Sequence, residues 1–139
     1  MKNTGRHIED FLESQGVTFV LQKQAEREDI EKRWLREFAK NVKSETGSWV
    51  HAKFKWHGFS YKYETAIEGS RAVQEYQRQW AASYFVFDED GTWSYGRTSE
   101  KYPDFTPIRA DIYVVHHNMK WTMVFTHEQP NNGPYFTKR

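Results

Sequence analysis

Apolar residues recur with a helical period in three stretches of the chain. In the clearest stretch, 24–43, an apolar side chain stands at every fourth position: Ile30, Trp34, Phe38 and Val42. This spacing places one apolar stripe along a helix. Stretches 4–16 and 65–80 show shorter patterns of the same kind, and the second opens with Thr65 and Glu68, the residues of a capping box. The pattern therefore predicts three helices.

Alternation of apolar and polar residues predicts strands in much of the remaining chain. A short strand is expected at 17–21. Two hairpins are expected further along, one from strands 83–88 and 92–98 and the other from strands 111–116 and 120–128. Consecutive hairpins imply strands that pair antiparallel to one another.

A longer β segment is expected at 49–63, with one irregularity. Apolar residues occupy even positions up to Trp56 and odd positions from Phe59 onward. A β-bulge at His57 and Gly58 would return all of these residues to one face of the sheet. Because bulges often re-aim a side chain beside a site, His57 becomes a candidate functional residue.

Together these elements predict an α+β fold, in which an antiparallel sheet of about five or six strands carries two or three helices packed on one face. The 139 residues are most simply a single domain, 1–139. No repeat, low-complexity tract or linker divides the sequence.

Composition then narrows the class of protein. The chain has no cysteine, which excludes disulfides, thiolate metal sites and cysteine nucleophiles and agrees with a reducing compartment. Its N-terminal stretch carries no apolar leader, and no apolar run approaches the ~20 residues that span a bilayer. A formal charge of +1 with interspersed signs argues against a dedicated phosphate-binding surface. We therefore expect a cytoplasmic protein with no cofactor and no membrane partner.

Aromatic residues dominate the apolar content. They make up 17% of the chain, with six Trp, eight Tyr and ten Phe, whereas leucine occurs only at Leu12, Leu21 and Leu35. Aromatic side chains must therefore fill the core, and buried Tyr and Trp need hydrogen-bond partners there. The same residue types are enriched at binding surfaces, so some of them also suit the recognition of another protein.

The last predicted strand ends in the densest group of chemically active residues. Trp121 and His127 share one parity and Glu128 has the other, so the adjacent His–Glu pair points to opposite faces of a regular strand. The two side chains meet only if the chain bends, and Pro130 favours a bend soon afterwards. The helical zinc motif His-Glu-x-x-His is absent. Because no other spacing gathers three or four ligands, no metal is expected.

A histidine with a positioned carboxylate and phenol can act as a general acid or base near neutral pH. The candidates for this role are His57, His127, Glu128 and Tyr135. Ribonuclease-like chemistry also needs a cation for the phosphate, for which Arg97 and Arg109 are available. Histidine and glutamate at strand ends are also ordinary fold-fixing hydrogen bonders, and this structural interpretation is favoured.

Four segments of the sequence resemble a small bacterial and phage family that is catalogued as a domain of unknown function of about this length. They are 56–61, 111–115, 121–128 (Trp-Thr-Met-Val-Phe-Thr-His-Glu) and 133–136 (Gly-Pro-Tyr-Phe). The resemblance covers the C-terminal two-thirds of the chain, from Trp56 onward, and leaves the N-terminal third open. The family has no assigned reaction, so the resemblance implies kinship and no mechanism.

The leading hypothesis is a non-enzymatic protein-binding module, of the immunity-like or phage-inhibitor type, because no complete catalytic motif accompanies the aromatic excess. The residues expected to bind are Trp56, His57, Trp121, His127, Tyr135 and Phe136. One alternative is a hydrolase or ribonuclease-like enzyme that depends on His127 and Glu128. Another is a single-stranded nucleic-acid binder, since basic and aromatic residues alternate at 53–56. The sequence does not specify the oligomeric state.

Overall fold

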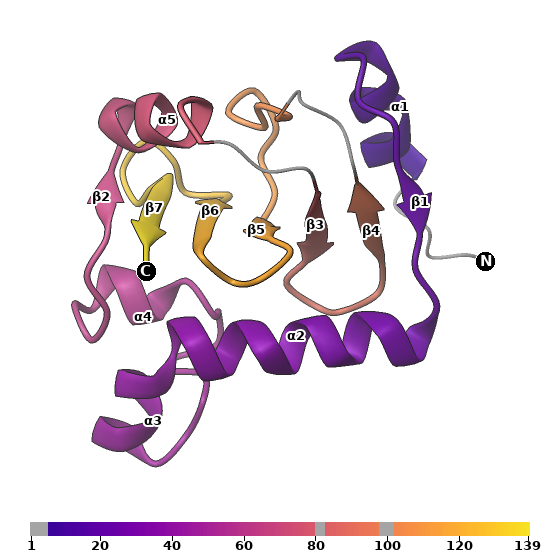
Figure 1. Ribbon diagram of the computed structural model, residues 1–139. Helices are drawn as coiled ribbons and strands as arrows, with labels where there is room; N and C mark the ends of the chain where they lie inside the picture. Colours follow the sequence, from indigo (N-terminus) through magenta and orange to yellow (C-terminus); the bar gives the residue numbers. More distant parts are fainter. Residues whose placement is uncertain (1–5, 80–82, 98–101) are drawn as a thin grey trace.

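The computed structural model describes residues 6–79, 83–97 and 102–139, which form an antiparallel sheet with helices on both of its faces (Figure 1). The strands are β1 Val20–Leu21, β2 Ile67–Glu68, β3 Tyr84–Asp88, β4 Ser94–Arg97, β5 Ile112–His116, β6 Trp121–Phe125 and β7 Tyr135–Lys138. The helices are α1 Arg6–Ser14, α2 Gln24–Phe38, α3 Lys40–Thr46, α4 His57–Ser60 and α5 Ser70–Gln77. The strand order is β1-β4-β3-β5-β6-β7-β2. The predicted α+β class and both hairpins are confirmed, and the seven strands and five helices of the described residues exceed the expected numbers.

The expectation that the helices pack on one face is wrong, because the central strands are apolar on both faces. In β5, Ile112 and Val114 point to one face, whereas Tyr113 and Val115 point to the other. Every residue of β5 and of the adjacent β6 is buried. Such strands need cover on both sides. Helices α1 and α5 supply it on one face and α2, α3 and α4 on the other, giving an α1/α5 core and an α2 core.

The α2 core is built around aromatic rings with satisfied polar atoms. Trp34 of α2 is fully buried and its ring lies 5.1 Å from that of Tyr113. Its indole Nε1 donates a hydrogen bond of 2.8 Å to the Thr122 hydroxyl, which in turn donates to the carbonyl of Val114 at 2.9 Å. The predicted apolar stripe of the long helix is thus confirmed as the contact to the sheet, although the helix breaks at Ala39 into α2 and α3.

Segment 49–63 does not form the predicted strand. It consists of turns followed by the short helix α4, and Ala52 and Lys53 adopt left-handed φ values of 63° and 122°. Gly58 does not mark a bulge. It lies where α4 packs against α3, and a Cβ at this position would stand 2.9 Å from Cγ2 of Val42.

The predicted start of the third helix is also corrected. Residues 67–68 form β2, which pairs with Phe136 and Tyr135 of β7, and α5 begins only at Ser70. Thr65 and Glu68 therefore do not form a capping box, because edge pairing with β7 competes with helix formation there. Both edge strands of the sheet, β1 and β2, are two residues long. Within the described ranges, no helix combines the length and the apolar character needed to cross a membrane.

Gly58→Ala tests the close packing of α4 on α3. The added methyl group would meet Val42 at 2.9 Å, so we expect overpacking to lower the free energy of unfolding by about 1–3 kcal/mol in urea denaturation. Gly96→Ala is the matched control, because a Cβ there meets its nearest neighbour at 3.5 Å, an ordinary contact. Equal unfolding midpoints for the two variants would contradict this account of Gly58.

Candidate functional site

The candidate site lies at the end of the sheet where β5 begins and β6 ends. Ile112 pairs with Phe125 across these strands, so Asp111 and His127 lie next to each other just beyond the pairing. Asp111 accepts hydrogen bonds from the backbone N–H of His127 at 3.0 Å and from the indole Nε1 of Trp56 at 2.9 Å. Its two carboxylate oxygens also lie 2.9 and 3.0 Å from Nδ1 of His127. One carboxylate therefore joins two distant segments of the chain.

The orientation of the His127 ring follows from this carboxylate. A carboxylate accepts hydrogen bonds, so Nδ1 carries the hydrogen that points at Asp111, and Nε2 is the ring nitrogen on the Glu128 side. Nε2 lies 3.4 Å from a carboxylate oxygen of Glu128, and the side chains of His127 and Glu128 are 38% and 42% exposed. The strand ends at Phe125, before the alternation could separate the pair. The chain therefore bends after Phe125, as is required for the side chains of His127 and Glu128 to meet.

A second polar network holds segment 55–56, which Asp111 contacts through Trp56. The Lys55 ammonium is 6% exposed and lies 2.8 Å from Glu31 and 3.3 Å from Glu89. The backbone N–H of Lys55 donates to Glu89 at 2.9 Å, and that of Trp56 donates to the Tyr113 hydroxyl at 3.1 Å. The Tyr113 hydroxyl donates to Glu89. Burial raises the pKa of Glu89, with Lys55 opposing the shift, and burial also raises the pKa of Tyr113.

Above these networks lies a group of aromatic and imidazole rings, which we call the ring surface: His51, Phe54, His57, Tyr61, Tyr63 and His127. Phe54 lies 5.5 Å from His57 and 5.1 Å from His127, measured between ring centroids. Tyr61 lies 4.7 Å from His51 and 5.2 Å from His57. Tyr61 is 54% exposed and the other rings are partly exposed. Trp56 is fully buried beneath them, 4.3 Å from His57 and 6.0 Å from His127.

The structure brings three of the predicted residues together and places two more, Tyr135 and Trp56, in the core next to them. His57, His127 and Glu128 share this surface, and electrostatic attraction from Glu128 opposes the burial that lowers the pKa of His57. Tyr135 lies behind them in the α2 core, with its ring stacked 6.4 Å from that of Trp56. Burial, the largest cause, raises the pKa of Tyr135 to about 12. Trp56, predicted to bind, is instead the buried support of the surface.

Of the remaining predicted residues, Trp121 and Phe136 lie away from this site, whereas Arg109 lies beside it. Trp121 and Phe136 are buried in the α1/α5 core, with ring centroids 6.1 Å apart. The Trp121 indole N–H is buried and has no hydrogen-bond partner among the described residues. The side chain of Arg97 lies outside the described part of the structure. Arg109 is exposed and lines a cavity of about 290 Å³ together with Asp111 and His127.

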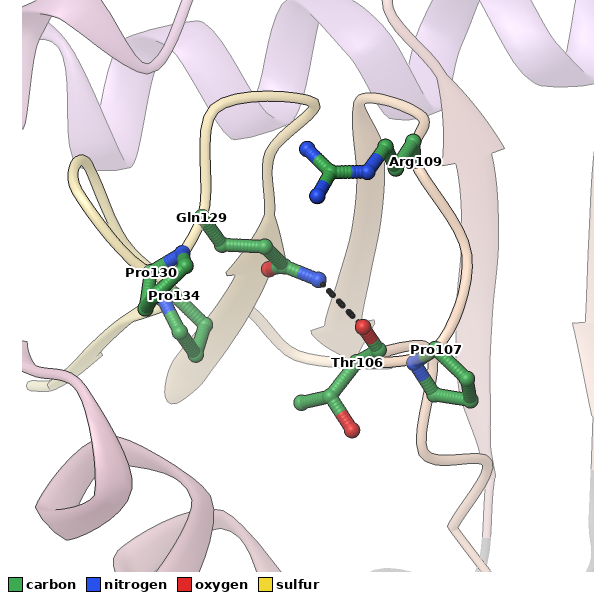
Figure 2. A pocket seen from close by; sticks show the side chains of 6 residues that line it. All are labelled: Thr106, Pro107, Arg109, Gln129, Pro130 and Pro134. Atoms are coloured by element: carbon green, nitrogen blue, oxygen red, sulfur yellow. Dashed lines mark hydrogen bonds between the residues drawn. The ribbon is translucent and has the colours of Figure 1, made fainter.

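Arg109 also lines a second cavity of about 280 Å³, formed with Thr106, Pro107, Gln129, Pro130 and Pro134 (Figure 2). In the described part of the chain, no group of three or more His, Cys, Asp or Glu residues is arranged to hold a metal ion. The site can therefore offer ring contacts, the Nε2 nitrogen of His127 beside Glu128, and the Arg109 cation.

Sequence reasoning missed Asp111 and the Lys55–Glu89 pair. The hairpin 111–116/120–128 contained a usable signal for Asp111, because its register places the first residue of one strand beside the end of the other. This signal lies outside any local motif around His127, because Asp111 precedes it by 16 residues. For Lys55 and Glu89, which lie 34 residues apart, local periodicity carries no signal.

The chain belongs to a family described as Domain of unknown function (DUF4275), whose model matches residues 7–136. The match includes most of the N-terminal third, which the motif resemblance had left open. Comparison with curated proteins and with solved structures gives no match.

Asp111→Asn tests the carboxylate that joins the two segments. The amide nitrogen of Asn would face a donor, leaving either Nδ1 of His127 or Nε1 of Trp56 without an acceptor. We expect the free energy of unfolding to fall by about 1–3 kcal/mol, measured by urea denaturation. Asp90→Asn serves as the control, because Asp90 is exposed and makes no hydrogen bond with the described residues. A loss equal to that of the control would refute the role of Asp111.

Stability should also depend on pH through His57 and His116. Burial lowers the pKa of both imidazoles in the folded state. As the pH falls below about 6.5, the unfolded chain takes up protons first, so the free energy of unfolding decreases until the folded imidazoles also protonate. The combined variant His57→Gln, His116→Gln should show a shallower decrease, measured by urea denaturation between about pH 7 and pH 5. An unchanged slope would argue against this assignment.

Proposed function

We propose that this chain is a protein-binding module that engages its partner through the ring surface, in the manner of an immunity protein or a phage inhibitor. The observation that carries the proposal is a continuous group of partly exposed rings held from beneath by buried residues. Phe54 contacts the imidazoles of His57 and His127, and Tyr61 contacts those of His51 and His57. The buried Trp56 ring packs beneath His57. Rigid aromatic side chains lose little conformational entropy on binding and are enriched among the residues that dominate interface energies.

The edge of the ring surface carries both charges, as interfaces commonly do. The Lys53 ammonium lies 5.4 Å from the centroid of the Phe54 ring. Lys62, next to Tyr61, forms an exposed ion pair of 2.7 Å with Glu68. Glu128 borders His127 on the other side. An apolar centre with a mixed-charge rim supports recognition of a protein surface more than binding of a polyanion, which would need a single sign of charge.

A second candidate function is general-base catalysis at His127. It is favoured by the Asp111–His127 pair, which leaves Nε2 as the acceptor of a proton from water or a hydroxyl group, and by Arg109 in the same cavity. It ranks second because Nε2 already lies 3.4 Å from a carboxylate oxygen of Glu128, and the nearby Ser60 hydroxyl is bonded to Nδ1 of His57. Nucleic-acid stacking has less support, since Lys55 and Trp56 of the basic–aromatic stretch are buried.

Loss of binding in ring-surface variants tests the primary proposal. The immobilised protein should capture a partner from extracts of its native cell, and the partner, once purified, should bind with a dissociation constant measured by calorimetry. Tyr61→Ala should raise that constant at least about tenfold. Leu21→Ala is the matched control, because Leu21 is an exposed apolar residue on β1 at the far edge of the sheet (Figure 1). Equal affinities of the partner for wild type, Tyr61→Ala and Leu21→Ala would contradict the proposal.

The catalytic alternative is tested separately by turnover. Wild type and His127→Gln are compared on RNA and on a simple phosphodiester. The binding proposal predicts background rates for both proteins. If His127 is a general base, wild-type turnover should exceed that of the variant by about 10²-fold or more. That result would replace the binding proposal with the hydrolase.

A further inference from the structure

The cavity between segments 106–109 and 129–134 is separate from the ring surface and has its own chemistry. Its volume is about 280 Å³. Three proline rings, Pro107, Pro130 and Pro134, form much of its wall (Figure 2). None of the six residues that line it is acidic. Its lining thus combines three apolar proline rings with the neutral polar residues Thr106 and Gln129 and a single cation, Arg109.

The wall opposite Arg109 is fixed by hydrogen bonds. Gln129 is buried, and its amide Nε2 donates to the carbonyl of Thr106 at 3.0 Å (Figure 2). Its Oε1 accepts from the backbone N–H of Thr126 at 3.2 Å. The carbonyl of Pro134 accepts from the N–H of Gly69 at 2.9 Å, which ties this loop to the start of α5. The hollow is therefore preorganised, and a ligand would not have to order it.

Arg109 supplies the polar recognition. Its guanidinium extends across the opening toward the Gln129 side chain (Figure 2). It forms no hydrogen bond or ion pair with any residue in the described ranges, so its donors are free for a ligand. A guanidinium presents paired N–H groups that match a carboxylate in a bidentate arrangement.

We propose that this cavity binds a carboxylate carried on an aromatic or other apolar group, with Arg109 taking the carboxylate and the proline rings taking the apolar group. The volume lies below the usual range of about 300–1,000 Å³ for drug-sized ligands, so the group is the size of one phenyl ring with a short chain. The ligand is either a free acid or the C-terminal residue of a polypeptide. This inference is independent of the ring surface and stands or falls on its own test.

The neighbouring charges favour a carboxylate over a phosphate. On its other side Arg109 borders the cavity whose lining includes the carboxylates of Asp88, Glu89, Asp90 and Asp111. A phosphate monoester carries about −1.5 to −2 charges at neutral pH and is repelled more strongly by these groups than a carboxylate with a single charge. Asp88, Glu89 and Asp111 accept hydrogen bonds from internal donors, and among the described residues neither they nor Asp90 forms an ion pair with Arg109.

The test is a titration of the full chain followed by ¹⁵N–¹H NMR, with 3-phenylpropionate as the probe. The uncharged 3-phenylpropionamide and phenyl phosphate are the comparison probes. We expect shifts at residues around the cavity and at least about tenfold weaker binding of the amide, because a charge-assisted pair is lost. No binding of the acid at about 10 mM, or equal binding of acid and amide, would overturn the proposal. Tighter binding of phenyl phosphate would overturn the assignment to a carboxylate.

Arg109→Gln provides the matching protein variant. It should weaken 3-phenylpropionate binding at least about tenfold and leave the urea midpoint unchanged, since Arg109 is exposed. Arg36→Gln, another exposed arginine, should bind like wild type. A short peptide ending in Phe, prepared as the free acid and as the amide, identifies the source. If the peptide acid binds tighter than the free acid, a chain end is the ligand; if it binds more weakly, a small acid is. Unchanged binding by Arg109→Gln would refute the site.

Discussion

The carboxylate of Asp111 is the interaction on which the site depends. It is 13% exposed and accepts hydrogen bonds from Trp56 and from both the backbone and the ring of His127. These donors lie 55 and 16 residues away along the chain. A buried polar group without a partner costs several times what a typical hydrogen bond contributes, so each of these segments is held where it satisfies the others.

The same logic extends through the aromatic core. A chain with so few leucines must bury Tyr and Trp, whose polar atoms then need partners; among the described residues the Trp121 indole N–H is an exception. Trp56 shows the consequence: its indole N–H binds Asp111 and its backbone N–H binds Tyr113, whose hydroxyl binds Glu89. Lys55 then pairs with Glu89. Segment 55–56 is thereby fixed on both sides, and the rings above it become a rigid surface. The contacts that fix the fold here are thus the ones that support the proposed binding surface.

Local sequence patterns correctly predicted the elements in which buried residues recur with a single helical or strand period. The stripe through Ile30, Trp34 and Phe38 and the two hairpins are confirmed. The predictions failed where tertiary contacts, and not local periodicity, determine the backbone conformation. In segment 49–63 the aromatic alternation reflects packing around Trp56, and left-handed residues exclude a strand. The prediction that the helices pack on one face was wrong because β5 and β6 are apolar on both faces. This feature is visible in their near-continuous apolar runs.

The candidate site was only partly predictable for the same reason. His57, His127 and Glu128 could be chosen by residue type, and they do gather. Asp111, which holds these residues in place, could not be chosen in this way, because it acts through contacts that link distant segments. The most direct test is amide and indole hydrogen exchange in wild type and Asp111→Ala, which removes the oxygen that accepts from both Trp56 Nε1 and the His127 N–H. The account predicts that the Trp56 indole and the His127 amide lose protection in the variant while β5 and β6 keep theirs. Unchanged protection of both groups would contradict the claim that Asp111 holds the site together.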